Sequence, residues 1–131
     1  MKPLIDVSSI YEAARTGRAN ELGGLHTVET ARYEIGNTLW KHTSLLGSYS
    51  AEESAEVIQL FNEAFHVMRF LQLKGHERGV LELATEPRTT YYDASYIYFA
   101  LRRELPLVTE DAQMTKKGRL AGLDCYSVKD L

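Results

Sequence analysis

The chain has 131 residues, of which 44% are hydrophobic and 25% are charged, and its formal net charge is −3. This length and composition favour one domain over residues 1–131 with a sizeable core, and the charge excludes the basic coat typical of proteins that bind nucleic acid non-specifically. Asp6 interrupts the apolar start of the chain, so we expect neither a signal peptide nor a membrane span. The single cysteine, Cys125, cannot form an internal disulfide and favours a reducing cytoplasm.

The first half of the chain alternates short apolar runs, typical of buried strands, with helical patterns. Ser8 and Ser9 offer side-chain oxygens that can cap a helix. Gly36 lies inside a helical pattern, where glycine costs about 1 kcal/mol relative to alanine, and therefore predicts close packing. This helix is predicted over residues 30–46, and its apolar face is expected to contain Ala31, Ile35 and Leu39. In chain order, the patterns predict a strand over residues 4–7, a helix over 10–15, a strand over 25–28 and a helix over 30–46.

The second half repeats this alternation with clearer helix boundaries. Ser50 and Glu53 form a capping box, in which each side chain bonds a free backbone amide, and Pro87 and Pro106 end the helical segments before them. The helix opened by the capping box is expected to bury Ala51, Ala55, Ile58, Phe61 and Phe65. The later patterns predict a strand over residues 67–71, helices over 75–84 and 92–104, a strand over 107–109, a helix over 112–121 and a strand over 124–128.

Strands that alternate with helices through short connections indicate an α/β fold. We expect a three-layer α/β/α sandwich with a mostly parallel central sheet covered by helices on both faces. In such sheets, ligands bind beyond the carboxyl ends of the strands. Residues at those strand ends are therefore the first candidates for a functional site.

Four acidic residues are predicted to reach this edge of the sheet. Asp6 lies at the carboxyl end of the strand over residues 4–7, and Asp111 follows the strand over residues 107–109. Asp93 begins a helix, and Glu34 lies next to the buried face of another helix. Each acid taken singly has a simpler explanation, because an aspartate at these positions can cap a helix and the glutamate can pair with a nearby Lys or Arg. Together the four would repel one another and raise their pKa values unless a cation lay between them.

A cluster of carboxylates predicts a site for a hard divalent cation such as Mg²⁺, which takes oxygen ligands and binds substrate phosphates. Such a site favours phosphoryl chemistry, in which metal-activated water attacks and no side-chain nucleophile is needed. The four histidines of the chain form no H-x-x-x-H pair, which excludes a zincin-type zinc site.

Three segments resemble the PIN-domain family. Residues 4–9 (LIDVSS) are similar to its opening strand, residues 92–100 (YDASYIYFA) to its central helix, and residues 107–111 (LVTED) to its L-V-T-x-D motif. Glu34 matches the acid in the helix after the second strand. The order Asp, Glu, Asp, Asp and the chain length are similar to those of VapC-type toxins, and the resemblance covers essentially the whole chain.

The resemblance implies a Mg²⁺- or Mn²⁺-dependent endoribonuclease that cuts RNA with metal-activated water and is held in check by a VapB-type antitoxin. It also implies a homodimer. Asp6, Asp93 and Asp111 would be direct metal ligands, and Glu34 would bind a second metal or a water. Glu29 competes with Glu34 for this role, because the proline that family members often carry before the glutamate is absent here. The alternative function is a catalytically silent PIN-fold module that acts by protein contact.

Several other side chains have two interpretations. By the same resemblance, Ser8 and Thr109 would orient the carboxylates as outer-sphere partners, although either hydroxyl could bond the local backbone instead. Lys116, Lys117 and Arg119 could contact RNA phosphates, but a solvated helix face is the simpler explanation.

The aromatic residues of the helix over 92–104 have a similar ambiguity. Tyr91, Tyr92, Tyr96 and Tyr98 cluster with Phe99 and could form a stacking platform for single-stranded RNA. Packing in the core or in a dimer is favoured, because aromatic side chains are enriched in both environments. Trp40 is expected at a contact with a partner or a second subunit.

Overall fold

The structure is a computed structural model and describes residues 2–85 and 88–131. Within these ranges, one sheet contains β1 (Leu4–Ile5), β2 (His26–Val28), β3 (Arg69–Leu71), β4 (Leu107–Val108) and β5 (Cys125–Tyr126). The strands lie in the order β3-β2-β1-β4-β5, and each of the four pairings between neighbours is parallel. The α/β class is therefore confirmed, with a parallel sheet.

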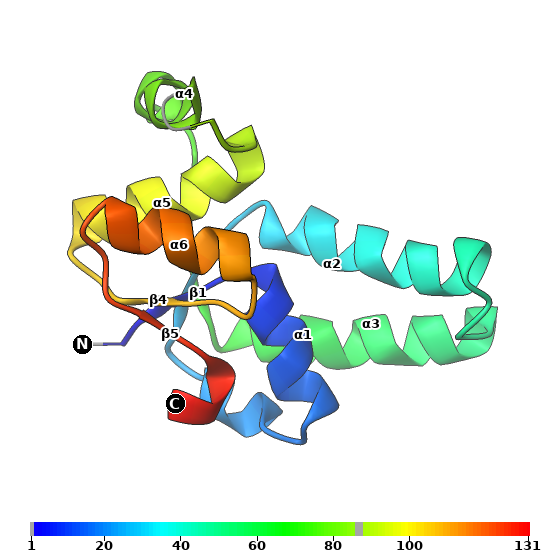
Figure 1. Cartoon of the computed structure of the whole chain (residues 1–131). Coiled ribbons are helices and arrows are strands. Elements are labelled where there is room, and N and C mark those ends of the chain that lie inside the picture. Colours follow the sequence, from blue (N-terminus) through cyan, green and yellow to red (C-terminus); the bar gives the residue numbers. More distant parts are fainter. Residues whose placement is uncertain (1, 86–87) are drawn as a thin grey trace.

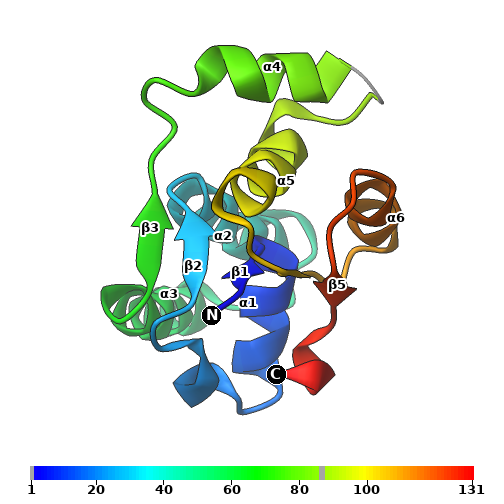
Figure 2. The ribbon, with the colours of Figure 1, turned by 90° about the vertical axis from the view of Figure 1, so that its left-hand side faces the viewer.

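Helices cover both faces of the sheet (Figures 1 and 2). They are α1 (Val7–Arg15), α2 (Ala31–Trp40), α3 (Ala51–His66), α4 (Glu77–Thr85), α5 (Tyr91–Arg103) and α6 (Ala112–Leu120). Shorter turns are η1 (Ala19–Leu22), η2 (Lys41–Leu45) and η3 (Val128–Asp130). The helices α1, α2 and α3 pack on one face and α5 and α6 on the other, while α4 packs on the outer side of α5. Within the described ranges, no helix has the length and apolarity needed to cross a bilayer.

The alternation of side chains along the central strands creates the two cores. Ile5 and Val108 are buried against α1, α2 and α3, whereas their neighbours Leu4 and Leu107 are buried on the opposite face with α5 and α6. Successive side chains of a strand point to opposite faces, and each fully buried Leu, Ile or Val stabilises the fold by roughly 1.5–3 kcal/mol. The three-layer arrangement follows from this division.

The first strand and helix meet earlier than the sequence predicts. The helix α1 begins at Val7, because Asp6 has extended backbone and its side chain accepts a hydrogen bond from the Ser9 amide. The prediction that Ser8 and Ser9 cap this helix is wrong, since both lie inside its first turn. Asp6 thus terminates β1 and caps α1 at once.

The α2–α3 hairpin also differs from the prediction. The helix expected over residues 30–46 changes at Lys41 from α-helix to a π-helical turn. The capping box of Ser50 and Glu53 is confirmed, but the predicted burial of Ala51 and Ala55 is wrong. Figure 1 shows that the beginning of α3 runs beside α2 away from the sheet, which explains this exposure.

Two glycines show where helices approach their neighbours. The close packing predicted at Gly36 is wrong, because a Cβ atom there would find Ile58 Cδ1 at 4.0 Å as its nearest neighbour. At Gly118 in α6, a Cβ atom would lie 2.8 Å from the Cys125 sulfur. Gly118 therefore allows α6 to lie directly against β5. The predicted helix end at Pro87 lies outside the described residues.

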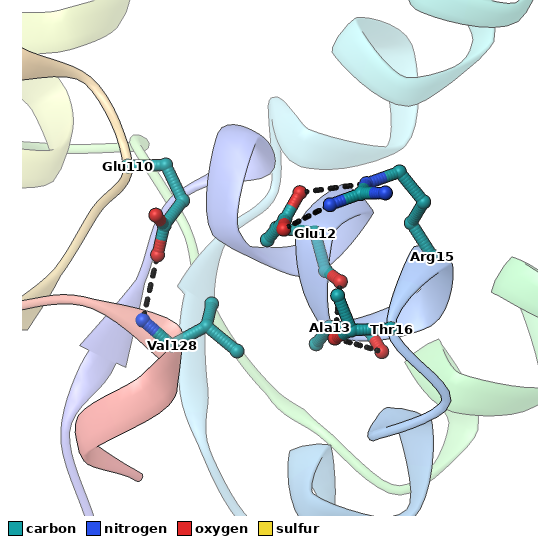
Figure 3. A network of polar contacts seen from close by, with 6 residues as sticks. All are labelled: Glu12, Ala13, Arg15, Thr16, Glu110 and Val128. Carbon is teal, nitrogen blue, oxygen red and sulfur yellow. Dashed lines mark hydrogen bonds and ion pairs between the residues drawn. The ribbon is translucent and has the colours of Figure 1, made fainter.

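The turn between β4 and α6 is fixed from two sides. The Glu110 carboxylate accepts a hydrogen bond of 2.6 Å from the Val128 amide (Figure 3), and the Glu110 amide donates to Ser8 Oγ at 3.1 Å. The turn that carries Asp111 is thus held against the beginning of α1 and against η3.

Within α1, Figure 3 also shows an ion pair, in which Arg15 donates from Nε and Nη2 to the Glu12 carboxylate at 2.9 and 2.5 Å.

Candidate active site

Asp6 lies at the point where the order of the strands reverses. The chain places β2 and β3 on one side of β1, and β4 and β5 on the other. Because Ile5 pairs with Val108, Asp6 and Thr109 emerge side by side at the carboxyl ends of adjacent strands. Ligands bind at such a switch point in parallel sheets. Figure 1 shows the beginnings of α1, α2 and α6 near one another at this edge.

Both carboxylate oxygens of Asp6 are held by hydrogen bonds. Oδ1 accepts from Ser8 Oγ at 2.7 Å and from the Ser9 amide at 3.0 Å. Oδ2 accepts from Thr109 Oγ1 at 2.5 Å. Asp6 is only 4% exposed, and burial raises the pKa of its carboxyl group although these hydrogen bonds lower it in part. The charged form of Asp6 is therefore costly without a cation.

Glu34 enters the same region from α2. Its Oε1 atom accepts a hydrogen bond of 3.0 Å from the hydroxyl of Tyr96, which is fully buried in α5. Burial raises the pKa of Glu34, the hydrogen bond from Tyr96 lowers it, and the charges of Asp93 and Asp6 raise it further. Tyr96 thus fixes the position of Glu34 across the space between two helices.

Asp93 and Asp111 complete the group of acids. Asp93 lies in the first turn of α5, whose N-cap is Thr90, so Asp93 does not cap this helix. Burial and the charge of Asp111 raise the Asp93 pKa, and the charge of Lys117 lowers it. Asp111 caps α6 through Oδ1, which accepts from the amides of Gln113 and Met114 at 2.8 and 3.1 Å.

One cavity of about 400 Å³ brings these acids together. We call it the acid cavity, and it is lined by Asp6, Val7, Ser8, Tyr11, Glu34, Thr38, Asp93, Tyr96, Asp111 and Met114. Glu29, the competing acid, instead lines a neighbouring pocket and accepts a long bond of 3.4 Å from the Leu73 amide. Of these two glutamates, Glu34 therefore lies with the three aspartates.

The donor set of the acid cavity fits a hard divalent cation. Within residues 2–85 and 88–131, no three Asp, Glu, His or Cys side chains converge closely enough to enclose a metal ion. Hydrogen bonds to Asp6 and the helix cap at Asp111 keep these carboxylates directed at protein amides and hydroxyls. Mg²⁺ retains several waters and needs only one or two carboxylates, so the carboxylate chemistry of the cavity fits it without an enclosing cage.

Two known proteins are similar to this chain over most of its length. The chain is 30% identical over 125 residues to ribonuclease VapC3 of Pyrobaculum aerophilum, an alignment that covers 89% of this chain and 95% of that protein. It is 32% identical over 119 residues to exonuclease VapC9 of the same organism, covering 87% of this chain and 84% of that protein. The chain belongs to the VapC family of PIN-domain nucleases.

A solved structure agrees with this membership. The crystal structure of PAE2754 from Pyrobaculum aerophilum matches with a TM-score of 0.80 and 27% sequence identity, over 99% of this chain and 92% of that one. No protein-family model matches the chain. The fold and the family are therefore inferred from individual proteins, each of which aligns with most of this chain.

The hydroxyl and basic residues predicted around the acids have different positions. Ser8 and Thr109 both donate to Asp6, and each also accepts a hydrogen bond from a backbone amide of the turn after β4. Lys117 is close enough to Asp93 to lower its pKa, whereas Arg119 donates to the Cys125 carbonyl at 3.2 Å. Lys116 is exposed on α6.

The sequence did not predict two tyrosines of the acid cavity as site residues. For Tyr96 it predicts packing or base stacking, but not the hydrogen bond that its hydroxyl donates to Glu34. The signal was its position three residues after Asp93, which places both side chains on one helix face. Tyr11 lines the cavity from α1, and its hydroxyl lies 2.8 Å from that of Tyr49. No sequence pattern indicates this contact, because Tyr11 lies in α1 and Tyr49 lies far along the chain in the loop before α3.

Proposed function

We propose that this VapC-family chain is a Mg²⁺- or Mn²⁺-dependent endoribonuclease. It hydrolyses RNA phosphodiester bonds and leaves a 5′-phosphate and a 3′-hydroxyl. The observation that supports the proposal is the acid cavity, in which Asp6, Glu34, Asp93 and Asp111 line one space at the switch point of the sheet. RNA is the proposed substrate because a relative that spans most of the chain is named a ribonuclease.

The side chains around the cavity have distinct tasks in this proposal. A bound divalent cation would neutralise the carboxylates, polarise the phosphodiester and lower the pKa of a water. The carboxylates that would bind the cation, directly or through its waters, are those of Asp6, Asp93 and Asp111, with Asp6 kept in place by Ser8 and Thr109. Glu34, oriented by Tyr96, would accept a hydrogen bond from the attacking water or bind a second cation. Lys117, beside Asp93, attracts the RNA phosphate.

The direct test compares two Asp→Asn variants. Asp6→Asn should abolish RNA cleavage in Mn²⁺ and retain the circular dichroism spectrum of the wild type. Asp124→Asn is the matched control, because Asp124 is exposed in the turn before β5 and away from the acid cavity. EDTA should stop the wild-type reaction. Equal cleavage by Asp6→Asn and the wild type would refute the assignment.

The mode of cleavage requires its own experiment, because one relative is named a ribonuclease and another an exonuclease. A circular RNA has no ends and is cut only by an endonuclease. We expect the wild-type protein to linearise it and the Asp6→Asn variant to leave it intact. Cleavage of the linear form alone would show that the chain is an exonuclease.

The names of the relatives also support a toxin role with a VapB-type antitoxin. We further propose that the free chain forms a homodimer. Trp40 is 51% exposed, and Leu45 and Leu46 beyond it are 65% and 67% exposed. Such an apolar surface suits a protein contact. Co-purification with the product of a short neighbouring reading frame, and light scattering of the free chain, would test the antitoxin and the homodimer separately.

A catalytically silent binding module remains the competing function. It is favoured by the absence, among the described residues, of three side chains that already enclose a metal ion. Calorimetry with Mn²⁺ distinguishes the two functions. The nuclease should bind Mn²⁺ with measurable heat that Asp6→Asn reduces, whereas the silent module should give no heat at millimolar Mn²⁺.

A further inference from the structure

An apolar pocket adjoins the acid cavity through a connecting hollow. The pocket, about 190 Å³ in volume, lies between the beginnings of α2 and α5 and includes Val28, Leu73 and Tyr91 in its wall. The connecting hollow shares Thr30, Tyr33 and Tyr92 with this pocket, and it shares Val7, Glu34 and Thr38 with the acid cavity. The three spaces therefore lie next to one another in a row, from the carboxylates to an apolar end, and we call this row the groove.

Two tyrosines stand at the mouth of this pocket. Tyr33 of α2 is 82% exposed and Tyr92 of α5 is 59% exposed, so neither ring belongs to the core. Both rings line the pocket and the hollow. Single exposed aromatics are ordinary on protein surfaces, but a pair from two helices that borders the groove of a nuclease site has the form of a stacking platform for a base.

The chemistry of the groove matches one nucleotide. Its acid end is suited to a cation and the phosphate that the cation binds, and its other end is apolar and bordered by aromatic rings. Lys41 and Asn37 line the hollow between the two ends, where a ribose and phosphate would pass. The Glu29 carboxylate on the pocket wall is a hydrogen-bond acceptor, which favours a base with an exocyclic amino group.

We propose that the tyrosine pocket, lined by Tyr33, Tyr91 and Tyr92 together with Glu29, binds one unpaired base of the RNA next to the cleaved phosphodiester. Tyr33 and Tyr92 stack on this base, and Glu29 accepts a hydrogen bond from its amino group. This inference rests on the proposed ribonuclease function and gives it a specificity-determining subsite. The enzyme then prefers unpaired adenine, guanine or cytosine over uracil at one fixed position relative to the cleaved bond.

The test measures both binding and cleavage. Fluorescence anisotropy with a labelled single-stranded RNA should show about tenfold weaker binding by the Tyr33→Ala, Tyr92→Ala double variant, since stacking on one aromatic ring contributes at this level. The corresponding Tyr→Phe double variant should bind like the wild type, because its rings still stack. Tyr126→Ala is the matched control, since Tyr126 is 48% exposed on β5 and outside the groove.

A series of RNAs with a single abasic site locates the pocket along the strand. In the wild type, one abasic position at a fixed distance from the cut should reduce kcat/KM about tenfold, and the double Ala variant should lose this sensitivity. Binding of the double Ala variant equal to that of Tyr126→Ala would overturn the proposal. A change in molecular mass in the double Ala variant would also overturn it, by showing that the face is a subunit contact. If the wild type cuts no RNA, the ribonuclease proposal fails, while the anisotropy measurement still decides whether the pocket binds a base.

Discussion

The hydrogen bond from Thr109 to Asp6 offers a sharp test of how the site is built. Thr109→Val keeps the shape of the side chain but removes a donor to Asp6 Oδ2 and an acceptor for the Asp111 amide. Thr109 is 2% exposed and Asp6 4% exposed, so the lost donor lies on the buried side of Asp6, where bulk water replaces it poorly. A hydrogen bond to a charged group contributes about 1.5–3 kcal/mol, and an unsatisfied amide costs about 1–3 kcal/mol.

Because Asp111 is exposed, water can reach its amide and the second cost lies at the low end of its range. We therefore expect Thr109→Val to lower the free energy of unfolding by about 2–4 kcal/mol. Metal affinity or nuclease activity should fall about 10- to 100-fold, as is usual when the partner of a metal-bound ligand is removed.

Urea unfolding and a Mn²⁺ titration measure the two effects. Thr109→Ser is the matched control, because it keeps the hydroxyl and loses only a methyl group. It should remain closer to the wild type in activity than Thr109→Val. If Thr109→Val and Thr109→Ser unfold at the same urea concentration and cleave RNA at the same rate, the hydroxyl does not hold Asp6, and the reasoning is refuted.

Three further predictions concern the same cavity and its support. Tyr96→Phe removes the donor to Glu34, so kcat should fall about tenfold and the Glu34 pKa, read from the pH–rate profile, should rise; an unchanged profile would contradict this. Gly118→Ala should destabilise the fold by about 1–3 kcal/mol, since its Cβ would meet the Cys125 sulfur at 2.8 Å. Gly36→Ala should instead stabilise it by about 0.5–1 kcal/mol in urea unfolding, since its Cβ would make only an ordinary contact with Ile58 Cδ1 at 4.0 Å. In EDTA, the stability that protonation of Asp6 contributes should be present at low pH and lost as pH rises through its raised folded pKa. Asp6→Asn should therefore flatten the pH dependence of the urea midpoint at pH values above the ordinary aspartate pKa of about 3.9, and an equal slope would refute the assignment.

The sequence was sufficient to predict the layers of the fold. Short apolar runs between helical patterns predict parallel strands, and the alternation within β1 and β4 supplies both cores. The exposure of Ala51 and Ala55 could not be predicted from the sequence, because it depends on how far α3 extends beyond the sheet. Helical periodicity shows which side chains share a face but does not show where the neighbouring layer ends.

The acids that follow strands could also be predicted from the sequence. Asp6 and Asp111 follow strands, and the strand order brings their ends to one edge. The contribution of Tyr96 was not predictable from its chemistry alone, because a buried tyrosine serves packing and hydrogen bonding at once. Only the packing of α5 against β1 and β2 shows that its hydroxyl reaches Glu34.

The helix caps and the acid site use the same atoms, and this affects how the site binds charge. Asp6 and Asp111 each satisfy backbone amides at the beginning of a helix, where the helix dipole favours a negative charge. These caps hold two carboxylates at one edge of the sheet in the absence of a cation, while burial raises the pKa of Asp6, Glu34 and Asp93. A divalent cation would remove this electrostatic cost at groups that are already fixed, so a large part of the ordering cost of the site is met by folding itself.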